Sequence, residues 1–258
     1  MVMKRKQIDP INLGPQLIVD GAPFEYVEAY KTLRTNFNFV AMNGKNRRVV
    51  VTSTLGNEGK SSTAINLSIS LAQAGSRVLL IDADMRRPSL HRYLRLKKET
   101  QTGLSALLTG NAKVGECLVK TEYGFDVITG GAVPPNPTEL IASESMRALL
   151  NHAAEHYDYI ICDAPPVGVI TDAAALSPLC DGVLFVIRQG FASRNQVTSA
   201  LNSLRVIGVK VLGTILNQYH IPKHPGKRYG YYRNGRYSYG YGYSYGYGYG
   251  HGHDPESE

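Results

Sequence analysis

The chain alternates between short runs of apolar residues and segments in which apolar residues recur every three or four positions. Runs such as RVVVTS at 48–53 and GVLFVIR at 182–188 are typical of strands buried on both faces. Between Phe24 and about Met42 the apolar residues recur at helical spacing and predict an amphipathic helix. The alternation predicts an α/β fold, a mostly parallel sheet with helices on both faces.

The predicted elements follow one another closely along the chain. Strands are expected at 48–53, 77–84, 125–130, 157–166, 182–188 and 209–218. Helices are expected at 24–42, 61–74, 89–93, 104–109 and 194–206, from 172 onward, and from a break at PPNPTEL (134–140) to about 156.

After Ile221 and Pro222 the apolar pattern ends, and Gly, Tyr and basic residues take over. A Tyr-Gly tract without Leu, Val or Ile cannot build a core, so residues 222–258 are expected to be a disordered tail. Residues 1–23 are expected to be an N-terminal arm, and 24–221 the folded domain. Accessible phenols in such number resemble substrates rather than scaffold. The ten candidate acceptors are Tyr229, Tyr231, Tyr232, Tyr237, Tyr239, Tyr241, Tyr243, Tyr245, Tyr247 and Tyr249.

Composition narrows the class of protein. The 258 residues are 43% hydrophobic, with no apolar run near the roughly 20 residues that span a bilayer. Cys117, Cys162 and Cys180 lack metal-type spacing and indicate thiols in a reducing cytoplasm. The net charge of +7 fits either a solvated basic surface or attraction to an anionic membrane through the chain ends.

The first strand leads into STLGNEGKSS and then a helix, the arrangement that wraps backbone N–H groups around nucleotide phosphates. Glycines let the backbone approach the phosphates closely, Lys60 would pair with their oxygens, and the Ser61 hydroxyl would ligate magnesium. Thr54 stands where the usual pattern begins with glycine, so an ordinary strand–helix turn remains the alternative for this loop alone. The candidate nucleotide-binding residues are Gly56, Asn57, Glu58, Gly59, Lys60, Ser61 and Ser62.

Two later strands end in acidic residues, Asp82 and Asp84 after the second and Asp163 after the fourth. The carboxyl ends of parallel strands line the ligand crevice of such a sheet. Three carboxylates gathered there repel one another unless a cation is present, and magnesium with nucleotide phosphates meets that need. Each aspartate alone could be a turn or helix-cap residue; together with the Lys-Ser loop they predict a P-loop NTPase-like site for ATP and Mg²⁺.

These residues resemble the bacterial tyrosine kinases, P-loop autokinases that accompany capsule and exopolysaccharide assembly. The loop with Lys60 and Ser61 is similar to the family's Walker A motif, VLLIDADMRRP to its Walker A′ motif, and IICDAPP to its Walker B motif. GLSALLTG, PPNPTEL and TDAAALSPLCDGVLFVIR are also similar, and the tyrosine cluster completes the match. The resemblance covers residues 24 to 249.

The resemblance implies a role for each matched residue. Lys60 neutralises phosphate charge, and Ser61, Asp82 and Asp163 hold magnesium directly or through water. Asp82 or Asp84 orients or deprotonates the acceptor tyrosine. Asn217, just after the last strand, resembles the asparagine that contacts adenine in related P-loop folds, although a turn-forming role would also place asparagine there.

Assembly and partners are implied in the same way. Glu28, Lys31 and Arg34 resemble the E-x-x-R-x-x-R helix that joins family members into a ring, with lysine replacing the first arginine and losing its bidentate fork. A charged face on a surface helix is the alternative. Family members without a membrane segment are recruited to the inner face of the membrane by the cytoplasmic end of a polytopic adaptor. A tyrosine phosphatase is a further expected partner, and nucleic acid is not.

Two other functions compete with kinase activity. Partition- and division-site ATPases share the fold but carry an extra lysine early in the loop, where this chain has Leu55. A binding protein for RNA or polysaccharide could use Tyr and Arg side chains for stacking. The stretch from Tyr239 to Tyr249 contains no cation, however, which favours the kinase interpretation.

Overall fold

A computed structural model of the chain describes residues 17–41, 47–96 and 102–219. These residues form one seven-stranded sheet in the order β3-β4-β2-β5-β1-β6-β7. Neighbouring strands are parallel except β3 and β4 at one edge. The strands are β1 (Arg47–Ser53), β2 (Val78–Asp82), β3 (Leu118–Lys120), β4 (Asp126–Ile128), β5 (Tyr159–Asp163), β6 (Gly182–Arg188) and β7 (Val211–Asn217).

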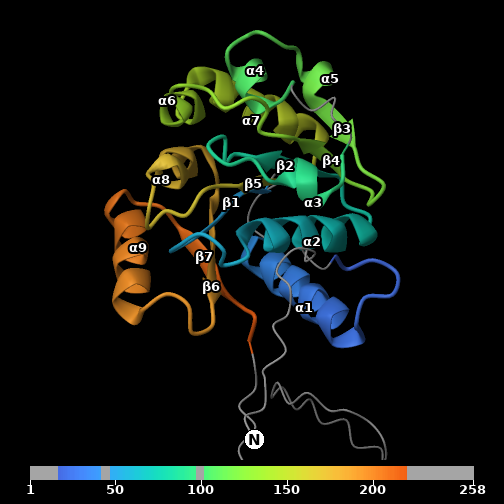
Figure 1. Cartoon of the computed structure of the whole chain (residues 1–258). Coiled ribbons are helices and arrows are strands. Elements are labelled where there is room, and N and C mark those ends of the chain that lie inside the picture. Colours follow the sequence, from blue (N-terminus) through green and yellow to red (C-terminus); the bar gives the residue numbers. More distant parts are fainter. Residues whose placement is uncertain (1–16, 42–46, 97–101, 220–258) are drawn as a thin grey trace, which may run out of the picture. The chain divides into compact units, whose positions relative to one another are not determined.

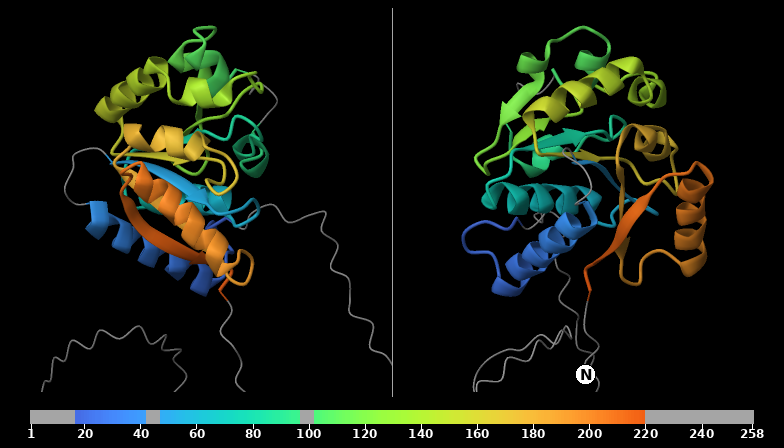
Figure 2. Two further views of the ribbon diagram at one scale, coloured as in Figure 1. Left: turned by 90° about the vertical axis from the view of Figure 1, so that its left-hand side faces the viewer. Right: turned by 180° about the vertical axis from the view of Figure 1, so that it is seen from behind.

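Helices cover both faces of the sheet (Figures 1 and 2). On one face α1 (Phe24–Ala41) packs on α2 (Lys60–Gln73), and α2 packs on β1, β2 and β5. The other face carries α7 (Glu144–His156), α8 (Asp172–Leu176) and α9 (Arg194–Val206). The short helices are α3 (Leu90–Tyr93), α4 (Leu104–Leu108), α5 (Val114–Cys117), α6 (Pro137–Ile141) and the 3-10 helix η1 (Ser177–Leu179).

The apolar runs of the strands supply two separate cores. Along β1, Val50 points into the core beneath α7, while Val49 and Val51 point into the core beneath α2. In β5 the same alternation places Ile160 in the core beneath α7 and Ile161 in the core beneath α2. Because each face of a central strand is buried, the runs are continuously apolar, and the predicted α/β architecture is confirmed.

Three details differ from the expectation. The strand β3 and the helix α5 before it were not predicted, because a three-residue edge strand has too short a pattern to recognise. The helix predicted to run to about residue 156 is two helices, and Ser143 caps the second by accepting a hydrogen bond from the Met146 N–H at 3.2 Å. Within the predicted arm, Ile18 is buried and its N–H donates to Asn66 of α2 at 2.9 Å, so the packed part begins before Phe24.

The sheet order decides which strand ends become neighbours. In the centre β5 lies between β2 and β1, with Asp82 of β2 opposite Asp163 of β5 and Asp163 opposite Val51 of β1. The three strands are parallel, so their carboxyl ends open at one edge, where the loop after β1 also lies. In the described part of the chain, no helix has the length and apolar content that crossing a bilayer requires.

Candidate active site

The loop from Thr54 to Gly59 joins β1 to α2 and is shaped from inside by Glu58. The fully buried Glu58 carboxylate accepts a hydrogen bond from the Leu55 N–H at 2.7 Å and another from the Arg188 N–H at 3.3 Å. This carboxylate therefore closes the loop and ties it to the end of β6. Glu58 was predicted among the nucleotide-binding residues, and its side chain serves here to fix the loop backbone.

Asn217 holds the same loop from the end of β7. Its Nδ2 donates to the Glu58 carbonyl at 2.8 Å, and it lies so close to Gly59 that a Cβ there would sit 2.0 Å from Nδ2. Gly59 also has a φ of 92°, which L side chains rarely adopt. A glycine at this position is thus required by both conformation and space. The contact of Asn217 with an adenine stays a prediction.

Lys60 and Ser61 open the first turn of α2, directly after the loop. Lys60 is buried, with 8% of its surface exposed, and Ser61 is partly exposed. The Ser61 hydroxyl accepts a hydrogen bond from the Ser89 hydroxyl at 3.1 Å. The turn therefore presents a cation and a hydroxyl at the N-terminal end of a helix, where the helix dipole also favours anions.

The Asp82 and Asp163 carboxylates are both buried at the neighbouring strand ends. Oδ2 of Asp82 accepts hydrogen bonds from the Ser89 and Leu90 N–H groups at 2.9 and 3.0 Å. Among the described residues, its Oδ1 and both oxygens of Asp163 have no hydrogen-bond partner of normal geometry, although the Ser61 hydroxyl and the charge of Lys60 lie close enough to act on Asp163. Buried polar atoms seldom lack hydrogen-bond partners in folded proteins. The oxygens of this pair are the ligand type that divalent cations prefer, and a bound cation would give them a partner.

The pKa values of both carboxylates reflect this environment. Burial raises the pKa of Asp163 to about 6, while the charge of Lys60 and the hydroxyl of Ser61 oppose that rise. Burial, together with the charge of Asp163, also raises the pKa of Asp82. Near neutral pH the pair carries negative charge at a cost, which a bound divalent cation would relieve.

Asp84 lies two residues beyond Asp82 and is partly exposed. Its Oδ1 accepts a hydrogen bond from the Arg87 N–H at 3.0 Å, which closes a tight turn after β2.

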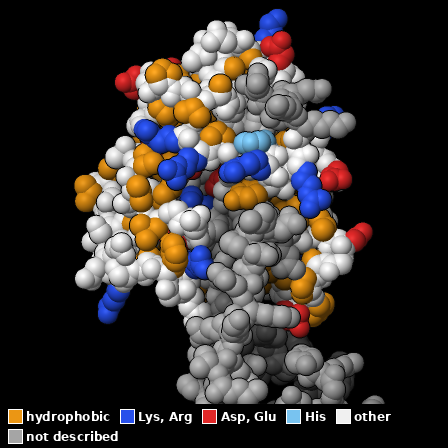
Figure 3. Space-filling model, in the orientation of Figure 1, with side chains coloured by type: hydrophobic (Ala, Val, Ile, Leu, Met, Phe, Trp, Pro, Cys, Tyr) orange, Lys and Arg blue, Asp and Glu red, His pale blue; other side chains and the backbone are white. Residues whose placement is uncertain are grey.

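In Figure 3 Lys and Arg side chains gather across the middle of the face shown, where few acidic side chains interrupt them. Such a basic face attracts anionic ligands such as nucleotides.

Comparison with known proteins places this site in a family. A family model described as an AAA domain matches residues 46–212. Tyrosine-protein kinase YwqD of Bacillus subtilis is 38% identical over 80% of this chain and 85% of its own length. Tyrosine-protein kinase CpsD of Streptococcus agalactiae is 38% identical over 74% of this chain and 82% of its own length.

The chain belongs to the bacterial tyrosine kinases. The solved kinase domain of the Escherichia coli tyrosine kinase ETK matches this tyrosine-kinase chain with a TM-score of 0.73 and 35% identity, covering 80% of each. The resemblance inferred from the loop and strand-end motifs is confirmed. The match decides against the partition-type ATPases, which share the fold but carry an early loop lysine where this chain has Leu55.

The predicted oligomer motif of this tyrosine kinase lies on α1. Lys31 pairs with Glu28 of the same helix at 2.8 Å, and both side chains are about half exposed. Arg34 is partly buried, and its guanidinium donates to the Ser70 carbonyl of α2 at 2.6 Å. Arg34 thus fastens α1 to α2 within the subunit, while Glu28 and Lys31 remain at the surface.

Sequence reasoning missed Ser89, which contacts both Ser61 and Asp82. It follows DADMRRP on the segment after β2, and only the fold brings it back to the loop. All ten predicted acceptor tyrosines lie outside the described residues.

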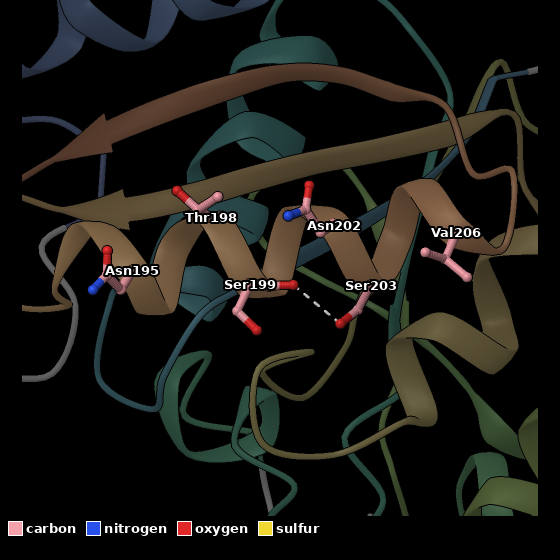
Figure 4. A pocket seen from close by; sticks show the side chains of 6 residues that line it. All are labelled: Asn195, Thr198, Ser199, Asn202, Ser203 and Val206. Atoms are coloured by element: carbon pink, nitrogen blue, oxygen red, sulfur yellow. Dashed lines mark hydrogen bonds between the residues drawn. The ribbon is translucent and has the colours of Figure 1, made fainter.

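A hollow runs along the exposed face of α9 (Figure 4), and its residues Ser199 and Ser203 also line a smaller pocket with Thr54 and Leu55 at the start of the loop. Uncharged side chains line the hollow, and the Ser203 hydroxyl donates to the Ser199 carbonyl at 3.1 Å. Its lining residues are Asn195, Thr198, Ser199, Asn202, Ser203 and Val206. None of the predicted site residues is among them.

Proposed function

We propose that this tyrosine kinase transfers the γ-phosphoryl group of ATP to tyrosines of its own C-terminal cluster, in trans between subunits. One observation supports the site assignment above the others. Beside the Lys-Ser turn, three buried carboxylate oxygens of Asp82 and Asp163 have no hydrogen bond of normal geometry to any described residue. A buried pair of this kind fits a magnesium ion bound together with nucleotide phosphates.

Each residue has a part in the proposed site. The backbone N–H groups of the loop cradle the phosphates, and Lys60 pairs with their terminal oxygens. Ser61, Asp82 and Asp163 would hold magnesium, which when bound neutralises charge on the phosphate oxygens. The loop residues assigned to the nucleotide remain Gly56, Asn57, Glu58, Gly59, Lys60, Ser61 and Ser62, with Asn217 beside them.

The acceptor tyrosine needs positioning and a place for its proton. Asp82 already accepts two backbone hydrogen bonds through Oδ2, whereas Asp84 is partly exposed. This contrast favours Asp84 as the residue that orients the phenol. The phenol oxygen forms a bond to the γ-phosphorus while the bond between that phosphorus and the ADP oxygen breaks. The phenol proton passes to Asp84, and ADP leaves with the electron pair.

The proposal extends to assembly and cellular place. A ring-like homo-oligomer would bring the tail of one subunit to the site of the next. The cytoplasmic end of a polytopic membrane adaptor would recruit the kinase to the inner face of the membrane, where it would regulate capsule or exopolysaccharide production. A tyrosine phosphatase would reverse the modification. These partners rest on the family resemblance.

The test follows phosphate between two distinguishable copies of the chain. Lys60→Met protein labelled with ¹⁵N is mixed with unlabelled wild type, ATP and magnesium, and intact masses are recorded. Steps of about 80 Da on the heavy species would support transfer in trans. Lys113→Met, which alters an exposed lysine on the same domain, is the matched control and should keep wild-type activity. ATP hydrolysis without any mass steps on wild type would contradict the kinase assignment.

A further inference from the structure

Three side chains that the proposed chemistry does not use, each from a different segment, form a hydrogen-bonded cluster around one buried carboxylate. Asp172, the first residue of α8, is fully buried. Arg86, from the segment after β2, donates to it through Nε at 2.8 Å and Nη2 at 3.3 Å. Thr138 of α6 donates its hydroxyl to the same carboxylate and accepts a hydrogen bond from Arg86 Nη2 at 3.0 Å.

This cluster differs from an ordinary surface ion pair. The Asp172 side chain has no exposed surface, while 39% of the Arg86 side chain is exposed. The guanidinium is held in a fork by two carboxylate oxygens and a hydroxyl, a geometry that leaves Arg86 little freedom. Asp172 fixes one side of Arg86, and the charge of Asp84 acts on it as well: both carboxylates contribute to raising the pKa of Arg86.

Arg86 lies in the middle of the turn that carries Asp84. The Arg87 N–H donates to the Asp84 carbonyl at 3.2 Å as well as to its side chain. At its far end the segment is fixed by Ser89, whose N–H binds Asp82 and whose hydroxyl binds Ser61. Among the described residues, the long-range side-chain hydrogen bonds from the middle of the turn, residues 85–87, are those of Arg86 with Asp172 and Thr138. Met85 also holds the turn, because its side chain is fully buried in the core beneath α7.

We propose that Asp172 and Thr138 are positioning residues, which hold Arg86 so that the Asp84 turn stands at a fixed place beside the phosphate loop. The inference rests on the proposed kinase function, in which Asp84 orients the acceptor phenol. It assigns a purpose to PPNPTEL and TDAAAL, which supply Thr138 and Asp172 and otherwise have no part in the chemistry. Transfer to an acceptor depends steeply on such placement.

Loss of the Asp172 cluster should affect the rate of phosphoryl transfer and not the binding of ATP. The loop is held by hydrogen bonds of Glu58, Asn217 and Arg188. None of these hydrogen bonds involves Asp172, Thr138 or Arg86. Releasing Arg86 should therefore slow phosphoryl transfer at saturating ATP while leaving nucleotide affinity intact. A merely structural ion pair would instead lower thermal stability and reduce binding and turnover together.

The experiment uses the full chain and four variants. Asp172→Asn keeps the shape of the side chain and removes its charge, and should lower the rate of tail phosphorylation on the order of 10- to 100-fold. The dissociation constant for ATP should stay within about twofold, because the loop contacts remain. Thr138→Val should show a smaller loss in the same direction, and Arg86→Lys should retain more activity than Arg86→Gln.

The matched control is Asp158→Asn, the same exchange at the Arg77–Asp158 pair before β5. Asp158→Asn should change neither the rate of tail phosphorylation nor the affinity for ATP. Wild-type turnover in folded Asp172→Asn protein would overturn the inference and leave the kinase assignment standing. If Asp172→Asn does not fold, wild-type turnover in both Thr138→Val and Arg86→Gln would overturn it instead. A wild-type chain that never gains phosphate would remove the kinase assignment and this inference together.

Discussion

Aspartates at the amino ends of three strands have hydrogen-bond partners, whereas those at the carboxyl ends of β2 and β5 leave buried oxygens without any. Asp126 accepts from the Tyr157 hydroxyl at 2.7 Å, and Asp181 accepts from the Arg48 N–H at 2.7 Å. Asp158 accepts from both the backbone and the guanidinium of Arg77, at 2.8 and 3.0 Å. All three are at least partly exposed, so water can supply what the protein does not.

Asp82 and Asp163 are shielded from water, and of their four oxygens only Oδ2 of Asp82 accepts hydrogen bonds of normal geometry from the described residues. Asp82 keeps one oxygen and Asp163 keeps two without a hydrogen bond of normal geometry, and burial raises the pKa of both. An unpaired buried carboxylate costs stability, so it persists in a folded protein where a ligand completes it. The two ends of the sheet therefore differ: carboxylates at the amino ends have hydrogen-bond partners within the protein, and those at the carboxyl ends of β2 and β5 have oxygens that fit a cation.

The largest test of this comparison is Asp163→Ala. Tail phosphorylation should fall by about 100-fold or more, because a carboxylate that would hold magnesium at the phosphates is lost. The magnesium-free protein should nevertheless melt near the wild-type temperature, because removing a buried carboxylate that lacks hydrogen bonds of normal geometry offsets the loss of its attraction to Lys60. Intact mass and thermal melts measure the two effects, with Lys60→Met as the inactive reference. Wild-type phosphorylation in Asp163→Ala would exclude Asp163 from the site.

A second prediction concerns pH in the absence of magnesium. The pKa of Asp163 rises from 3.8 to about 6 on folding, so the folded state binds its proton more tightly than the unfolded state. The stability contributed by this proton is present below about pH 4 and is lost as pH rises through about 6, on the order of 3 kcal/mol in all.

In urea unfolding from pH 4.5 to 8, the free energy of unfolding of Asp163→Asn should therefore increase relative to that of wild type as pH rises. Magnesium should stabilise wild type more at pH 8 than at pH 5.5, because protons compete with the cation. If the free energies of unfolding of variant and wild type differ by the same amount across this pH range, Asp163 is not the group responsible for the pH dependence.

The loop itself provides a third test. Gly59→Ala introduces a Cβ at a φ of 92° and against the Asn217 amide, and should lower the unfolding free energy by about 1–2 kcal/mol. Gly56→Ala is the control, because nothing lies within 4 Å of its added Cβ and its φ is not positive. Equal stability of the two variants would contradict the strain. Loss of nucleotide affinity in Gly56→Ala alone would indicate that the Cβ blocks a phosphate.

Much of this arrangement was predictable from local patterns. Apolar runs predicted six of the seven strands, and the acidic residues at the ends of two runs predicted that Asp82 and Asp163 would lie at one edge of the sheet. Contacts between distant segments were not predictable. Glu58 accepts from an N–H 130 residues away, and Arg86 reaches a carboxylate 86 residues away. No periodicity encodes such pairs, because they depend on the order in which strands assemble.

The smallest effect is expected from breaking the exposed ion pair between Arg77 and Asp158 at the amino end of β5. Their side chains are 63% and 43% exposed, so water and salt already screen the attraction. Asp158→Asn should shift the melting temperature by less than about 2 °C, and 0.5 M salt should abolish even that difference. Phosphorylation should be unchanged, because the pair lies at the opposite end of β5 from Asp163. A loss of activity in Asp158→Asn as large as in Asp163→Ala would mean that the two ends of the sheet are coupled, and the division between structural and functional aspartates would fail.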